Sequence, residues 1–135
     1  MRRRYARELA LQVLYQMDVG KSSSEKAMEY ISEQCDEQNV IDFSASLVQG
    51  TVENMSKIDN IISAHLTSWK LNSIAAVDRN LMRLATYELY YCEDIPSSVS
   101  INEALELAKI FSGEKSSKFI NGILDAIKKD FEVEN

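Results

Sequence analysis

Residues that build turns are scarce in this sequence, which has one proline and four glycines among its 135 residues. All-β proteins need many turns, and turns depend largely on these two residue types. The shortage therefore argues against an all-β fold and favours helices. The two cysteines, Cys35 and Cys92, form no Cys-x-x-Cys pair, so we expect two separate thiols rather than a disulfide.

Signatures of membrane proteins and of common enzymes are also missing. No apolar run approaches the roughly 20 residues that span a membrane. The N-terminal arginines are not followed by a signal-peptide core, because Arg7 and Glu8 interrupt it. His65 is the only histidine, and the sequence has neither a glycine-rich phosphate loop nor a Gly-x-Ser-x-Gly elbow. We therefore expect a cytoplasmic protein with no metal site, no cofactor and no enzymatic activity.

The length and composition are those of one globular domain, with 45% hydrophobic and 27% charged residues. Apolar residues recur at helical spacing, which predicts an all-α fold. Gly20 ends the first helix, and Pro96 breaks the chain before the sixth, which we expect to begin with the capping box Ser100-x-x-Glu103. About seven helices around one or two cores are expected, near residues 3–19, 24–34, 42–56, 57–67, 73–91, 100–111 and, after a serine cap at 116 or 117, up to 130.

The net charge of −6 argues against nucleic acid, but the charge is unevenly distributed. Residues 1–7 hold four arginines and no acidic residue, and residues 115–129 hold four lysines and one aspartate. Residues 8–114 hold seven basic and seventeen acidic residues. The sequence thus describes an acidic body with a basic patch near each end of the chain.

The first predicted helix carries a polar face that suits RNA. On a helical wheel its apolar residues form one stripe, and the opposite arc holds Arg4, Arg7, Glu8, Gln12 and Tyr15. Tyr15 lies only about 20° from Arg4 on this wheel. A base can stack on a tyrosine while arginines hold phosphates, which is how single-stranded RNA is commonly bound. The alternative is that Tyr15 covers a neighbouring helix.

The last predicted helix begins with Ser116, Ser117 and Lys118, where free N–H groups and the helix dipole favour a phosphate. The plainer interpretation is that a serine caps the helix.

In the fifth helix, Glu88 falls on the core stripe, where a carboxylate must be paired or hydrogen-bonded. We expect backbone N–H groups or a hydroxyl near residues 98–102 to be its partners.

The outward arc of the fifth helix mixes long, apolar and aromatic side chains. Such a mixture suits a protein interface, although a solvated face is an equal alternative. The residues concerned are Arg79, Met82, Arg83, Thr86 and Tyr90.

Several stretches match the motifs of a known family in the same order along nearly the whole chain. They are RELALQVLYQ at 7–16, Trp69-x-Leu71, VDRxLxRLAxYEL at 77–89, Asp94-Ile95-Pro96 followed by INEAxELAK at 101–109, and SKFINGILD at 117–125, where x is any residue. Together they resemble the NusB family. Two positions depart from the usual pattern: Met17 stands where the opening motif often has tryptophan, and Lys115 stands where some members have an acidic residue.

The resemblance implies a single NusB-like domain, 1–135, built from two small helical subdomains at about 1–72 and 73–135. It implies a bacterial RNA-binding factor that binds the boxA element of ribosomal RNA leader transcripts together with NusE, a protein of the small ribosomal subunit. The pair then joins an antitermination complex on RNA polymerase. Some members form dimers, so a homodimer remains an alternative.

By position, the resemblance implies an RNA surface and a partner surface. The RNA surface comprises Arg3, Arg4, Arg7, Gln12, Tyr15, Ser117, Lys118, Phe119 and Asn121. The NusE-facing surface lies on the fifth helix around Asp78, Arg79, Met82 and Arg83.

Two other functions remain open. A ribosomal RNA methyltransferase carries a NusB-like domain ahead of its catalytic domain, but a chain ending at Asn135 leaves no room for a cofactor-binding sheet. A protein adapter with only incidental RNA contact is the second alternative, against which the four arginines and Tyr15 argue.

Overall fold

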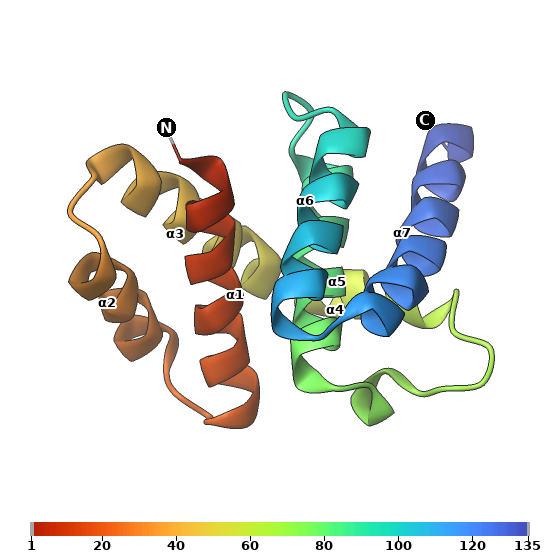
Figure 1. Ribbon diagram of the computed structural model, residues 1–135, viewed down its shortest axis with the longest axis horizontal. Coiled ribbons are helices and arrows are strands. Elements are labelled where there is room, and N and C mark those ends of the chain that lie inside the picture. The colour runs from red at the N-terminus through yellow and green to blue at the C-terminus, as the bar shows by residue number, and fades with distance from the viewer. Residues whose placement is uncertain (1, 135) are drawn as a thin grey trace.

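The computed structural model describes residues 2–134, and these contain helices and no strand, so the prediction of an all-α fold is confirmed. Seven α-helices and one short 3₁₀ helix follow one another along the chain (Figure 1). They are α1 (Arg3–Val19), α2 (Ser24–Gln34), α3 (Gln38–Glu53), α4 (Met55–Ser63), η1 (Leu71–Ser73), α5 (Ala76–Tyr91), α6 (Ser97–Phe111) and α7 (Glu114–Glu134).

The first two helices have the predicted bounds, but α6 begins three residues before the expected capping box. Pro96 occupies the N-cap with a φ of −57°, a value at which the proline ring is already fixed for helix entry. The helix therefore starts at Ser97, and Ser100 already donates its N–H to the carbonyl of Pro96. The capping-box prediction is wrong, and the side chains of Ser100 and Glu103 are free for other contacts.

The start of α7 also lies earlier than predicted. Gly113 adopts a φ of +113°, which glycine tolerates and other residues rarely do, and the helix begins at Glu114. The N–H of Ser117 donates to the carbonyl of Gly113 at 3.1 Å, so this amide is already part of the helix. The prediction that Ser116 or Ser117 caps the helix is therefore wrong.

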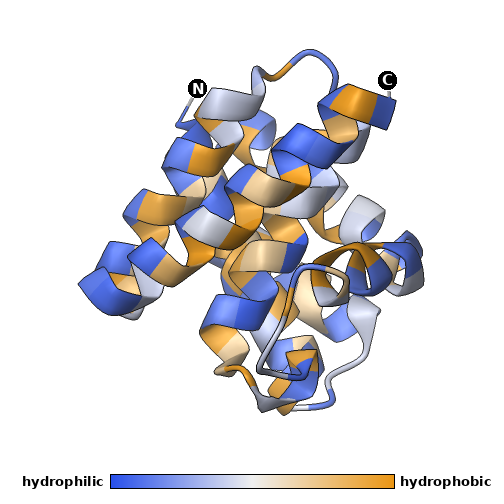
Figure 2. Ribbon diagram, turned by 90° about the vertical axis from the view of Figure 1, so that its right-hand side faces the viewer, coloured by the Kyte–Doolittle hydropathy of each residue, from blue (hydrophilic) through white to orange (hydrophobic). Residues whose placement is uncertain are grey.

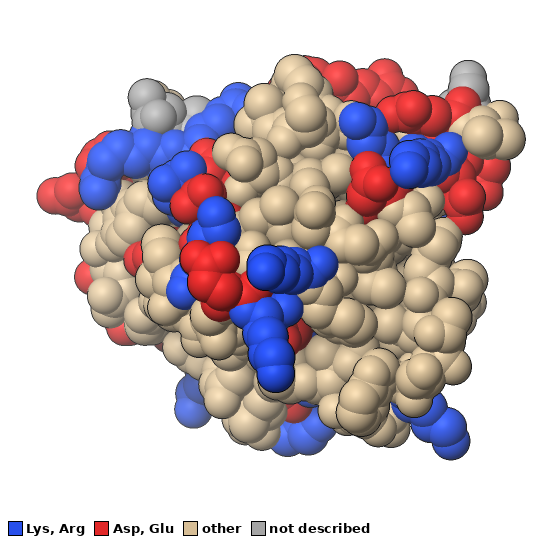
Figure 3. All heavy atoms as spheres, turned by 45° about the vertical axis from the view of Figure 1, so that its right-hand side comes forward, with Lys and Arg blue, Asp and Glu red and all other residues tan. Residues whose placement is uncertain are grey.

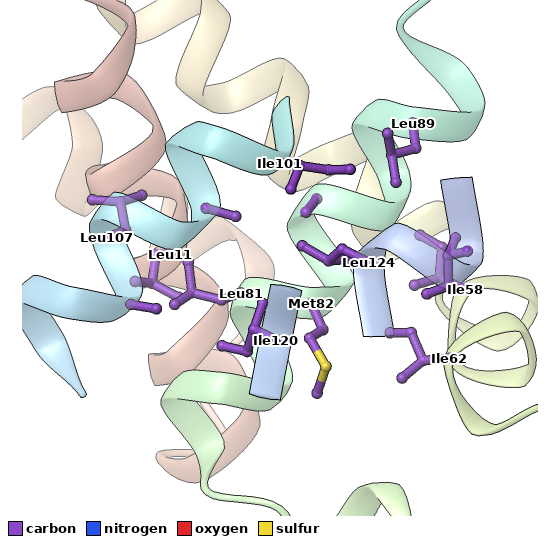
Figure 4. Packing of buried hydrophobic residues seen from close by; sticks show 14 of the residues in the cluster. Leu11, Ile58, Ile62, Leu81, Met82, Leu89, Ile101, Leu107, Ile120 and Leu124 are labelled. Atoms are coloured by element: carbon purple, nitrogen blue, oxygen red, sulfur yellow. The ribbon is translucent and has the colours of Figure 1, made fainter. Parts of the chain in front are cut away.

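Two hydrophobic cores divide the helices between α3 and α4. One core joins α1, α2 and α3, and the other joins α4 to α7 (Figure 1). In Figure 2 apolar and polar residues alternate along the helices, as amphipathic helices require. Leu81, Met82, Ile120 and Leu124 meet in the second core, with Ile58 and Ile62 of α4 beside them (Figure 4).

Helix α5 is the centre of the molecule, because it packs against α1, α3, α4, α6 and α7. Leu84 of α5 belongs to the first core, and Leu11 of α1 belongs to the second, so these two helices connect the halves. A helix covered on so many sides has little outward face. Met82 and Thr86, expected to face outward, are fully buried, and that expectation is wrong for both.

Candidate nucleic-acid interface

The N-terminal turn of α1 presents three exposed arginines, and each one already has a partner. Arg2 binds Glu37 through Nη2 at 2.6 Å, and Arg4 binds Glu103 through Nε at 2.7 Å. The guanidinium of Arg3 lies 4.6 Å from the centre of the Phe43 ring, a cation–π distance. The arginines are thus ordered on the surface, with half or more of the Arg2 and Arg4 side chains exposed.

Arg7 does not lie on this surface, so its predicted outward position is wrong. Its side chain is only 3% exposed, and it holds Glu88 through Nη2 at 2.8 Å and Nε at 3.0 Å. The hydroxyl of Ser100 donates to the same carboxylate at 2.9 Å, which confirms the expected hydroxyl partner of Glu88. The wheel of α1 placed Arg7 outward because it could not include α5 and α6, which cover that side.

Tyr15 borders a pocket of about 340 Å³ that also contains an aromatic residue from α6. Tyr15 is 39% exposed, and Phe111, at the end of α6, is 41% exposed. Gln12 lies in the same pocket, and its Oε1 accepts a hydrogen bond from the hydroxyl of Tyr30 at 2.7 Å. An apolar slot with exposed rings and a fixed amide can receive one flat base.

The sequence interpretation missed Phe111 and Tyr30 as members of this pocket. Each belongs to another helix, so no wheel of α1 contains them. Phe111 did carry a signal, since it is a large apolar residue directly before the break at Gly113. Such a residue at a helix end is often left uncovered by the next helix.

A second pocket, of about 420 Å³, lies at the start of α7. Lys118 and Asn121 are exposed near it, and Phe119 lines it together with Lys115 and the 61% exposed Trp69. Its full lining is Trp69, Ser73, Ile74, Asp78, Lys115, Ser116 and Phe119.

Ser117 is turned away from this pocket. It is 4% exposed, and its hydroxyl donates to the carbonyl of Leu105 at 3.2 Å. The side chain of Ser117 thus joins α7 to α6 and does not lie on the surface.

The two pockets meet at consecutive residues of α5. Val77 lines the first pocket, and Asp78, the next residue of α5, lines the second. The hydroxyl of Ser112, which follows Phe111, donates to Asp78 at 2.6 Å and holds the end of α6 against the start of α5. Residues of α1 and of the first turn of α7 therefore lie on adjoining parts of the surface.

The residues expected to face NusE are mostly engaged within the chain. Arg79 binds Asp18 at 2.8 Å, and Arg83 binds both Asp18 and Asp59. Burial alone would raise the pKa of Asp18, but hydrogen bonds from Arg79 and Asn80, with the charges of both arginines, hold it below its usual value. This network joins α1, α4 and α5. Of the four residues expected at that interface, Met82 is fully buried, and Asp78 lines a pocket.

Charges on the surface are intermixed rather than segregated. Figure 3 shows basic and acidic side chains interleaved on the face it presents, with a broad uncharged area between the groups. The two pockets of Tyr15 and Phe119, which we call the RNA-type surface, therefore form a local site on an acidic protein, as the charge distribution predicts.

The described residues 2–134 show few features for metal binding, for crossing a membrane or for thiol chemistry. They contain no group of three or more His, Cys, Asp or Glu side chains that could hold a metal ion. No helix among them is long and apolar enough to cross a membrane. Burial, followed by the charges of Glu88 and Asp94, raises the pKa of Cys92 to about 11, so its thiol stays protonated near neutral pH and is a poor nucleophile.

Comparison with known proteins identifies the family. The model of the NusB family matches residues 4–129. The chain belongs to the NusB family. It is 49% identical over 132 residues to the transcription antitermination protein NusB of Bacillus subtilis (strain 168), with 98% of each chain covered. It is 51% identical over 130 residues to the protein of that name from Bacillus pumilus, covering 96% of this chain and 97% of the other.

Solved NusB structures have the same fold. NusB of T. maritima superposes with a TM-score of 0.87 at 40% identity, covering 96% of this chain and 92% of that one. A second solved structure is the crystal structure of the antitermination factors NusB and NusE in complex with double-stranded RNA. It contains a chain that superposes with a TM-score of 0.87 at 29% identity, covering 96% of this chain and 99% of that one. The fold of this NusB-family chain is therefore that of proteins crystallised with NusE and RNA.

Proposed function

We propose that this chain is an RNA-binding transcription antitermination factor. It binds the boxA element of ribosomal RNA leader transcripts together with NusE and joins the antitermination complex on RNA polymerase in the bacterial cytoplasm. It acts by binding and carries out no catalysis. The observation that carries the proposal is the pair of adjoining pockets, of which Tyr15 and Phe111 border one and Phe119 and Lys115 line the other.

The proposed RNA contacts divide into two kinds. Tyr15 and Phe119 offer rings for stacking, with Gln12 and Asn121 as polar neighbours, while cationic groups hold phosphates. The cationic groups are Arg3, Arg4, Lys115 and Lys118. Arg7 and Ser117 act indirectly, since each is buried and fastens its helix to another. NusE extends this surface beyond the start of α5.

Replacing Tyr15 by alanine should weaken boxA RNA binding by roughly tenfold, because a stacked base contributes about 1–3 kcal/mol. Tyr91→Ala is the matched control, since Tyr91 is 37% exposed and lies at the far end of α5, away from both pockets. Fluorescence anisotropy with boxA and scrambled RNA measures both variants, with and without NusE. Equal affinity for boxA and scrambled RNA, in both wild type and Tyr15→Ala, would instead favour the adapter function.

Replacing Glu37 by glutamine should strengthen RNA binding by up to about fivefold, which corresponds to an exposed ion pair of 0–1 kcal/mol. Arg2 is exposed and directly precedes Arg3 and Arg4, so we propose it as a further phosphate contact, but Glu37 holds its guanidinium at 2.6 Å and RNA phosphate must compete with that carboxylate. Glu33→Gln makes the same change of charge in the last turn of α2, four residues before Glu37, and no ion pair of Glu33 occurs among the described residues. Equal gains for the two variants in the same titration would mean that net charge alone, and not release of Arg2, sets the affinity.

A further inference from the structure

The α2–α3 hairpin carries the whole net charge of the protein. Residues 24–53 hold one basic residue and seven acidic residues, a net charge of −6, which equals that of the complete chain. The remaining residues are therefore neutral in sum. The carboxylates of the hairpin repel RNA phosphates, so its acidic side suits a partner other than RNA, whereas Tyr30 of α2 lines the Tyr15 pocket.

A groove of about 380 Å³ lies between these two helices at the open end of the hairpin. Met28, Val48 and Val52 give it an apolar floor, and Glu25 and Glu53 stand on it from opposite helices. Both glutamates are exposed, and neither forms an ion pair within residues 2–134. The groove exists because α2 packs more closely on α1 than on α3, with Ala27 and Ile31 turned into the first core.

The groove is separate from the RNA-type surface. It shares no lining residue with the pockets of Tyr15 and Phe119. The RNA-facing arginines reach the other end of the hairpin, where Arg2 binds Glu37. Helix α2, 11 residues long, separates the two places by about 16 Å. Both surfaces can therefore be occupied at once, and in Figure 1 the hairpin lies on the side of the molecule away from α7.

We propose that this groove docks a basic segment of a second protein, which inserts one apolar side chain between α2 and α3 and places lysines or arginines against Glu25 and Glu53. The apolar floor supplies an anchor pocket, and the unpaired carboxylates select positive charge on both sides of it. The rest of the hairpin's acidic surface steers the basic segment toward the groove. The contact goes beyond the RNA and NusE functions, and it adds an attachment point that leaves the RNA surface open.

The test uses the full chain, labelled with ¹⁵N, and a synthetic basic peptide that carries one leucine between flanking lysines. We expect amide shifts confined to the α2–α3 groove. We expect loss of binding when the leucine of the peptide is replaced by serine. The double variant Glu25→Lys/Glu53→Lys should weaken peptide binding by about tenfold or more.

Glu29→Lys/Glu33→Lys is the matched control, because it reverses two exposed charges of α2 that do not line the groove. Equal weakening in both double variants would overturn the proposal, since general attraction would then explain the binding. Amide shifts at the pockets of Tyr15 and Phe119 in place of the groove would overturn it as well. So would a solution mass that doubles with concentration in wild type but not in Glu53→Lys, because a second copy would then occupy the groove. None of these outcomes depends on whether the chain binds boxA RNA.

Discussion

Replacing Glu88 by glutamine lowers the free energy of unfolding by about 3–5 kcal/mol, the usual cost of removing one partner of a buried ion pair. Glu88 and Arg7 are 2% and 3% exposed, so neither charge can turn to water when the other is lost. The hydrogen bond from Ser100 can persist to the amide, but the guanidinium of Arg7 loses its close counter-charge and keeps only the carboxylate of Glu103, 3.9 Å away. Since small domains have about 5–15 kcal/mol of stability, the loss is large.

Urea denaturation measures the loss, and Arg4→Met serves as the comparison. Arg4 pairs with Glu103 on the surface, with 51% of its side chain exposed, so breaking that pair should cost under about 1 kcal/mol. The double variant Arg7→Met/Glu88→Leu should recover most of the stability, because apolar side chains can replace a buried pair. Similar losses for Glu88→Gln and Arg4→Met would refute the assignment of a buried pair.

The double variant also tests the role of Arg7 in RNA binding. If Arg7 only fastens α1 to α5, the folded double variant binds boxA RNA as wild type does. A loss of affinity in a protein that remains folded would mean that Arg7 leaves Glu88 and contacts the RNA itself.

Replacing Gly50 by alanine should destabilise the protein by about 1–3 kcal/mol, the cost typical of overpacking. A Cβ at Gly50 would run into the ring of Tyr87, where α3 crosses α5. A loss of stability is unusual for this substitution, since alanine normally stabilises the interior of a helix by about 1 kcal/mol relative to glycine. Tyr87 also stacks on Tyr91, with ring centres 5.4 Å apart, so it cannot move aside freely.

Gly122→Ala is the matched control for this substitution. Gly122 also lies inside a helix, α7, and a Cβ there meets nothing within 4 Å. We expect Gly122→Ala to stabilise the protein by about 0.5–1 kcal/mol. Thermal denaturation of both variants measures the difference, and a stabilised Gly50→Ala would show that α3 and α5 are not held at this crossing.

The family and the helices could be predicted from sequence because both depend on local order along the chain. Apolar spacing marked α1 and α2 at their observed ends, and a wheel correctly left Tyr15 exposed. Helix starts were less certain where two local signals competed. Pro96 began α6 ahead of the Ser100 capping box, and Gly113 allowed α7 to begin before the serines.

The partners of polar residues could not be read from one helix at a time. Glu88 was expected to need a partner, and the partner proved to be Arg7, which had been assigned to RNA. Arg79 and Arg83 were assigned to a protein interface but bind Asp18 and Asp59. A wheel gives the direction of a side chain from its own helix axis, and it contains no information about the helices that cover that direction.

The sequence by itself determined the all-α class, the NusB family and the two basic ends of an acidic chain, because these follow from residue order and spacing. Only the tertiary structure decided which members of the basic face are available. Packing of α5 and α6 against α1 buried Arg7 and left Arg4 and Tyr15 exposed. It also brought Phe111 beside Tyr15, and the start of α7 beside both, since contacts between distant segments depend on how whole helices pack.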